Sequence, residues 1–338
     1  MANSIPQVIK PSLVYGLGVV SPFMEEDRKA STIERSNNNA IGLLSEEKIL
    51  EDIPLEKHIL SSLEYDNIMI DSDKTITLGS RGIIIDAKNN ATITVHIKHD
   101  DNRILGILSS AIIIKCNKSS NITLIIVQDD HEQTITGKTA FFLKGIIGEN
   151  ATLTINELVI TGNDSYRKSR ILLKGDNAKV YPIHGIFSYN NSKIDAESDV
   201  DHDSSNSESD MKIRAIISDN SSAIIQGDVT IKPNAHNSNG YQQEDIILLG
   251  ENAVARPIPN LEIGNHDVKC SHGATVSNVD EETLYYAMSR GISREDALSM
   301  LISSFLSPVL GSFPRELLTV YEERISRIVS DSLIKGDS

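Results

Sequence analysis

The chain has 338 residues, with 32 Lys and Arg against 47 Asp and Glu, which gives a formal net charge of −15. Proteins that bind nucleic acid need a surplus of cations facing the phosphates, so this acidic balance argues against nucleic acid as a partner. Two cysteines, Cys116 and Cys270, are too few for a disulfide framework and favour a reducing, cytoplasmic location. The most apolar N-terminal stretch, residues 13–20, is too short to span a membrane, and we expect no membrane anchor.

The N-terminal part of the chain, residues 1–65, is predicted to form a partly helical cap. Within it, residues 45–62 place apolar side chains at helical spacing, but Pro54 interrupts them. This pattern is typical of a short helix or an irregular segment.

Residues 66–279 form the predicted core, which contains one β-branched run after another. Runs such as ITLIIV at 122–127 and ATLTI at 151–155 have the usual length of a strand, and Gly, Asn, Asp and Ser separate them. No helical pattern of convincing length interrupts the runs. The sequence therefore predicts an all-β core and excludes doubly wound α/β folds, which need a helix between parallel strands.

Asparagines that open strands recur along this core. They are Asn90, Asn121, Asn150, Asn177, Asn191, Asn220 and Asn252, with spacings of 27 to 32 residues apart from one of 14. Such a period indicates a solenoid, and the short spacing is interpreted as one repeat with an extra turn. A right-handed parallel β-helix explains the period, the many isoleucines and the absence of Trp. The competing fold, a β-sandwich, has turns every ~8–12 residues and an aromatic core.

An acidic segment at 195–210 contains seven carboxylates and no Lys or Arg. Asp199, Asp201, Asp203 and Asp210 have the spacing of a calcium-binding loop. The required Gly at the sixth position is replaced by Ser204, and the Glu at the twelfth is missing. We therefore expect a solvated, mobile loop.

Residues 280–338 change to helical texture and are predicted to form a three-helix domain. The first helix ends near Gly291, the second begins at Ser293 and is expected to break at Pro308 and Gly311, and the third begins at Pro314. Large apolar side chains in this domain are expected either to bind a partner or to pack in a core. They are Tyr285, Tyr286, Met288, Met300, Leu301 and Phe305.

The segment with the most chemical potential is DVKCSHGATV at 267–276. On a strand, alternation places Cys270 and His272 on one face. A thiol and an imidazole at this spacing can bind a soft metal, and the structural alternative is a buried cysteine beside a satisfied histidine. Glu244 lies 26 residues before Cys270, about one repeat, and in the right register would reach the same metal ion.

The C-terminal third resembles the SufB/SufD family of iron–sulfur cluster assembly scaffolds. The resemblance is carried by residues 209–306, above all by KCSHGATV and by SRGIS with Ala297 four residues later. It implies a right-handed parallel β-helix with a C-terminal helical domain. It also implies a scaffold subunit of a SUF-type complex, where nascent clusters assemble from iron and delivered sulfur at a β-helix dimer interface and pass to acceptor proteins. The resemblance further implies that a SufC-like ABC ATPase, bound by the C-terminal helices, carries the enzymatic activity.

Residue by residue, the resemblance assigns His272 to a histidine that both branches of the family have at the dimer interface. Cys270 matches the cysteine of the SufD-like branch. Glu244 occupies the place of the essential cysteine of the SufB-like branch, and Gly273 the place of a glutamate important for assembly. The motif is thus SufD-like. Either the chain works with a SufB-like subunit, or two copies supply two Cys270 and two His272 in a homodimer.

Two functions from other classes remain as alternatives. A β-helix carbohydrate-active enzyme is compatible with the fold and the charge, but sugar sites favour aromatic platforms and this chain has no Trp. The other alternative is a non-catalytic interaction module, in which the helices bind a partner and Cys270 is inert.

Overall fold

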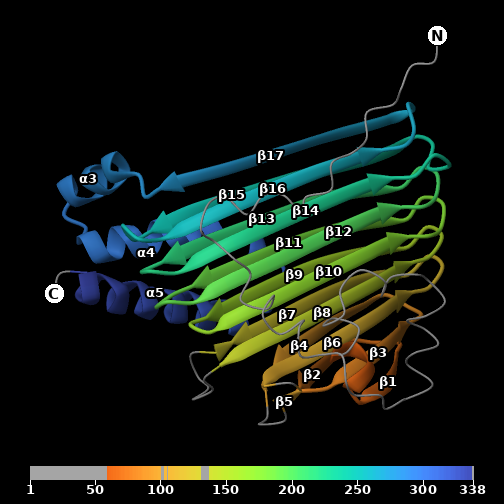
Figure 1. Ribbon diagram of the computed structural model, residues 1–338, viewed down its shortest axis with the longest axis horizontal. Helices are drawn as coiled ribbons and strands as arrows, with labels where there is room; N and C mark the ends of the chain where they lie inside the picture. Colours follow the sequence, from red (N-terminus) through yellow and green to blue (C-terminus); the bar gives the residue numbers. More distant parts are fainter. Residues whose placement is uncertain (1–58, 100–102, 105, 131–136, 337–338) are drawn as a thin grey trace.

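The computed structural model describes residues 59–99, 103–104, 106–130 and 137–336. The chain winds as a parallel β-helix whose strands alternate between two sheets (Figure 1). The first sheet consists of β1 (Tyr65–Ile70), β3 (Gly82–Ala87), β6 (Ile107–Cys116), β8 (Lys138–Ile147), β10 (Asp164–Leu173), β12 (Lys193–His202), β14 (Ser222–Ile231) and β16 (Val254–Ile263), with the short β5 (Arg103–Ile104) antiparallel to β6. The second consists of β2 (Lys74–Leu78), β4 (Ala91–Ile97), β7 (Asn121–Asp129), β9 (Thr152–Thr161), β11 (Lys179–Ser188), β13 (Glu208–Ser218), β15 (Ser238–Leu249) and β17 (Val268–Asn278).

The main core lies between the two sheets. Parallel register stacks each interior side chain on its counterpart one coil away, as in the column Ile93, Leu124 and Ile155. All three are fully buried in one cluster that also takes in residues of the first sheet. Burying each such side chain contributes about 1.5–3 kcal/mol, which explains why this core needs neither Trp nor disulfides. The predicted all-β core and parallel β-helix are confirmed.

The turns confirm the role predicted for asparagine. Asn150 and Asn177 adopt left-handed backbone angles, with φ of 56° and 60°, and the Asn177 side-chain amide donates to Oδ1 of Asn150 at 2.9 Å. The spacing of 14 residues was predicted to mark an extra turn, and this prediction is wrong. Asn177 precedes a strand of the second sheet and Asn191 one of the first, so the repeat changes from one row of turns to the other.

The acidic segment is not the solvated, mobile loop that the sequence predicts. Residues 195–202 belong to β12 and residues 208–210 to β13. Charges from the neighbouring coil compensate the carboxylates: Lys168 pairs with Glu197 at 3.0 Å and Arg170 with Asp201 at 2.8 Å. These cations lie about one coil away in the sequence, which is why the composition of the segment alone is misleading.

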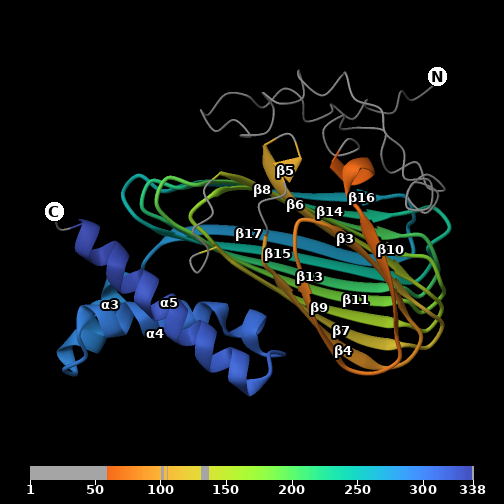
Figure 2. The ribbon, with the colours of Figure 1, turned by 90° about the horizontal axis from the view of Figure 1, so that it is seen from below.

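Three helices follow the last strand: α3 (Glu281–Ser289), α4 (Arg294–Leu310) and α5 (Arg315–Gly336). They pack on the outer face of the second sheet (Figure 2), where an apolar cluster joins α4 and α5 to its middle strands. The predicted break at Pro308 is wrong, because α4 continues to Leu310. Proline leaves the Ser304 carbonyl without its helical donor, and the Ser307 hydroxyl donates to that carbonyl at 2.8 Å instead.

The N-terminal cap prediction falls mostly outside the described residues. Residues 59–62 are helical, and Ile59 and Leu60 pack with Phe142 and Tyr166 on the outer face of the first sheet. Within the described part of the chain, no helix has the length and apolar character needed to cross a membrane.

Candidate functional site

Strand β17 ends the second sheet and, among the described residues, pairs on one side only, with β15. It carries Cys270 and His272, whose register partners are Gly240 and Gln242. Because paired residues of parallel strands share a face, both side chains lie on the face of β17 that continues the interior of the β-helix. Cys270 is half-buried against the main core, whereas His272 is exposed. The edge therefore offers a thiol and an imidazole at the boundary between core and solvent.

Two opposing influences act on the Cys270 thiol. Burial raises its pKa, while a hydrogen bond from the Gly240 backbone amide favours the thiolate and offsets part of that rise. A protonated thiol therefore predominates in the free protein, and binding a metal releases the proton to solvent. Thiolate sulfur and imidazole nitrogen are donors that suit iron, so the chemistry of this pair fits an iron ligand set.

Glu244 does not lie beside Cys270. It pairs with Ala274, four residues beyond the Gly240–Cys270 pair. Its side chain is fully buried, and its Oε1 lies 2.6 Å from the point that a Cβ on Gly227 would occupy. Burial raises the pKa of Glu244 to about 7, with Oε2 unpaired and Oε1 3.3 Å from the Gln242 amide nitrogen that donates to it. The carboxyl therefore faces the interior, away from the exposed edge.

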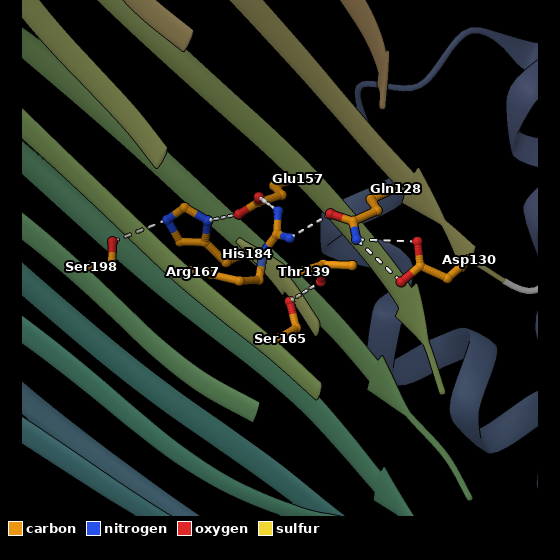
Figure 3. Close-up of polar contacts among 8 residues, drawn as sticks. All are labelled: Gln128, Asp130, Thr139, Glu157, Ser165, Arg167, His184 and Ser198. Atoms are coloured by element: carbon orange, nitrogen blue, oxygen red, sulfur yellow. Dashed lines mark hydrogen bonds and ion pairs between the residues drawn. The ribbon is translucent and has the colours of Figure 1, made fainter. Parts of the chain in front are cut away.

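Sequence reasoning missed a chain of buried polar side chains in the middle coils (Figure 3). Glu157 forms an ion pair with Arg167 and a 2.5 Å hydrogen bond with Nδ1 of His184, whose Nε2 lies 3.0 Å from the Ser198 hydroxyl. Arg167 also donates to Oε1 of Gln128 at 2.7 Å. The chain thus crosses the interior from the second sheet to the first.

The network keeps a charged carboxylate in the interior. Burial alone raises the pKa of Glu157, but the Arg167 charge and the His184 hydrogen bond outweigh it and hold the pKa at about 2. One sequence signal was available: Glu157 and His184 are 27 residues apart, about one coil, and occupy paired positions. Polar residues at positions where neighbouring coils carry Ile or Leu identify such a network.

The six apolar residues predicted to bind a partner divide into two groups. Tyr285, Tyr286, Met288 and Met300 are exposed, with 74 % of Tyr285 and 61 % of Met300 accessible. Leu301 and Phe305 instead pack against the cluster beneath the helices. Phe305 also anchors α4, because its carbonyl oxygen accepts from Arg214 at 2.9 Å and its ring lies under the same guanidinium.

The fold and the edge together define a β-solenoid protein that is flanked by a helical layer and carries a thiol and an imidazole on its terminal edge strand. The chain matches the family model "SUF system FeS cluster assembly, SufBD core domain" over residues 68–305. It belongs to this family.

Named relatives agree with the family. The chain is 30 % identical over 180 residues to an iron–sulfur cluster assembly SufBD family protein of Synechocystis, and 29 % over 160 residues to the SufD protein of Escherichia coli. These matches cover 53 % and 47 % of this chain but only 37 % and 38 % of the relatives. SufD of Bacillus subtilis is 35 % identical over 115 residues, which are 32 % of this chain and 26 % of that protein.

Proposed function

We propose that the chain is a scaffold subunit of a SUF-type complex that builds nascent iron–sulfur clusters and transfers them to acceptor proteins. The observation that carries this proposal is the presence of Cys270 and His272 on the exposed edge strand of a SufBD core domain. Iron and delivered sulfur are the substrates, and the cluster is a transient product. The residues bind and orient iron, and they perform no redox or hydrolytic step of their own.

The site is completed by a second SufB/SufD-family subunit. One chain offers the Cys270 sulfur and a His272 nitrogen, whereas an iron of a cluster needs four ligands, which two edges facing each other supply together with sulfide. No strand among the described residues pairs with the outer edge of β17, so its backbone groups on that side suit a partner strand. A homodimer and a heterodimer with a SufB-like subunit both meet this requirement.

The ATPase is a separate subunit of the SufC-like ABC type, docked on α3 and α4. Support comes from the exposed side chains of α3 and α4, which are Tyr285, Tyr286, Met288 and Met300, since exposed large apolar side chains favour an interface. ATP hydrolysis takes place in that partner, and a sulfur donor and cluster acceptors complete the pathway. The complex works in the cytoplasm, where free thiols persist.

Co-expression with a SufC-like ABC ATPase tests the assembly. We expect affinity-tagged chain to retain the ATPase, and the double variant Tyr285→Ala/Met300→Ala to retain at least about tenfold less. Val320→Ala, an exposed apolar residue on α5, serves as the matched control and should retain the wild-type amount. Equal retention by the double variant would rule out docking on α3 and α4.

A further inference from the structure

A row of polar side chains crosses the outer face of the second sheet and ends on the edge strand. Arg214 on β13, Asp245 on β15 and Thr275 on β17 are register partners in three consecutive coils. Thr275 lies an odd number of residues from Cys270 and from His272, so its side chain is on the opposite face of β17. The row therefore reaches the candidate site from behind.

Asp245 uses both oxygens of its carboxylate in this row. Its Oδ1 accepts from the Thr275 hydroxyl at 2.7 Å and from the Gln243 side-chain amide at 2.8 Å. Its Oδ2 lies 3.7 Å from Nη2 of Arg214, in an ion pair whose two side chains are partly buried. Partial burial limits the screening of this pair by salt and water. One carboxylate thus links the edge strand to a strand two positions inside the sheet.

Arg214 continues the row to helix α4. Its Nη1 donates to the Phe305 carbonyl oxygen at 2.9 Å, and its guanidinium lies 5.0 Å from the centre of the Phe305 ring. Asn156 on β9 holds the same helix further along, because its amide donates to the Val309 carbonyl oxygen at 2.9 Å. Of these two polar attachments of α4, the one at Arg214 continues through Asp245 to β17.

Gln243 makes a second contact between β15 and the edge strand. It is the register partner of Gly273, and a Cβ on Gly273 would lie 2.6 Å from Oε1 of Gln243. The glutamine side chain therefore covers the backbone of β17 immediately after His272, and glycine leaves the room that it needs. Two neighbouring side chains of β15, Gln243 and Asp245, hold β17 at positions 273 and 275.

We propose that Asp245 is a positioning residue for the edge strand. It fixes β17, and with it Cys270 and His272, relative to α4, because it holds Thr275 on one side and Arg214 on the other. Asp245 contributes no ligand and touches no reacting atom. The inference rests on the proposed function in one respect, which is that Cys270 and His272 form the site that is being positioned.

The rate at which iodoacetamide alkylates Cys270 in the full chain measures how firmly β17 is held. Peptide mass spectrometry reads Cys270 and the buried Cys116 separately, so Cys116 reports any general loosening of the fold. Thr275→Val keeps the shape of the side chain and removes its hydroxyl. We expect alkylation of Cys270 about fivefold faster than in the wild type, because a lost hydrogen bond favours local opening of the strand. Thr275→Ser keeps the hydroxyl and should restore the wild-type rate.

Arg214→Met tests the link to α4. We expect it to accelerate Cys270 alkylation about twofold or more, although residue 214 is two strands away from β17. Lys212→Met is the matched control, since Lys212 lies on the same strand and face but pairs with Asp210 of its own strand at 2.8 Å. It should leave the rate unchanged. Asp245→Ala removes both contacts and should give the fastest alkylation of all.

An unchanged rate in Thr275→Val would overturn the inference, as would an equal acceleration in Thr275→Ser or in Cys116. An Arg214→Met rate no faster than that of Lys212→Met would overturn it as well. Because alkylation needs no metal, this test is separate from cluster binding. If Thr275→Val is accelerated but Cys270→Ala keeps its cluster after reconstitution with iron and sulfide, the proposed function fails and the positioning of β17 stands.

Discussion

The early and late coils of the β-helix share one backbone geometry but differ in their interiors. Between β2 and β7, the interior columns hold mainly aliphatic side chains such as Ile93, Val95 and Leu124, and the polar chain begins at Gln128 near the end of β7. From β9 onward the same columns also hold Glu157, His184 and Glu244. The strands pair in regular parallel register in both regions. The two regions therefore differ in their interior side chains and not in their backbone geometry.

This difference identifies the coils in which interior side chains cost the fold stability. Buried aliphatic side chains stabilise the fold without needing partners. Buried charges need a complete set of partners, and the late coils supply one for Glu157 but leave an oxygen of Glu244 unpaired. Substitutions in the two regions are therefore expected to differ in the size and the pH dependence of their effects.

The largest effect is expected from Arg167→Met in the polar region. It leaves the Glu157 carboxylate buried without its cation, and we expect the free energy of unfolding at pH 7 to fall by about 3–5 kcal/mol. The low native pKa of Glu157 stabilises the fold above pH 4.5, and this contribution disappears as the pH falls towards 2. Urea denaturation at pH 7 and pH 3 measures both values. A loss that is equal at the two pH values would contradict the role of the ion pair.

In the aliphatic region, Leu124→Ala is expected to lower the free energy of unfolding by about 2–5 kcal/mol, because it opens a cavity in a fully buried column. The loss should be the same at pH 5 and pH 8, since no titrating group is involved. Metal binding at the distant edge should not change. A pH-dependent loss would show that the two regions are not separate.

Glu244→Gln tests the unpaired carboxyl. The native pKa of about 7 lies above the ordinary 4.5, so the unfolded state ionises first and the wild type loses stability as the pH rises from 4.5 through 7. The variant lacks this titration, and we expect it to gain up to ~3 kcal/mol over the wild type at pH 8, relative to pH 4. Thermal denaturation across this range measures the gain. A constant difference would mean that the native pKa of Glu244 is not raised above its ordinary value.

The smallest effect is expected at an asparagine turn, a type of turn that both regions contain. Asn177→Ala forces a Cβ-bearing residue without a turn-forming side chain to keep φ near 60°, and we expect a loss of about 1 kcal/mol. Asn177→Gly should lose less, because glycine adopts this angle freely. Urea denaturation of both variants tests the order, and a larger loss for glycine would contradict it.

The fold was predictable because its determinants are local. Isoleucine runs, strand-opening asparagines and the capping Ser293 each act within a few residues, and all agree with the β-helix and its helices. Contacts between coils were not predictable, because they depend on register. Between β15 and β17 the repeat is 30 residues, as the pair Gly240–Cys270 shows, so a separation of 26 places Glu244 out of register with Cys270.

Part of the candidate site could be predicted, because it depends on residues close together in the sequence. The contacts between strands could not be predicted, because they depend on register. Cys270 and His272 share a strand, so alternation alone places them on one face. Arg167 reaches Glu157 from the opposite sheet, a contact that alternation along one strand does not predict. The acidic segment was misread in the same way, because its compensating Lys168 and Arg170 lie in the neighbouring coil.

The central claim is that Cys270 on the terminal edge strand binds the nascent cluster. Anaerobic reconstitution of the chain with a SufC-like ATPase and a second SufB/SufD-family subunit, using iron and sulfide, tests it by visible absorption and iron content. The matched control is Cys116→Ala, which removes the other free cysteine, buried in the main core. We expect Cys116→Ala to carry as much cluster as the wild type and Cys270→Ala to lose most of it. An unchanged cluster content in Cys270→Ala would contradict the account.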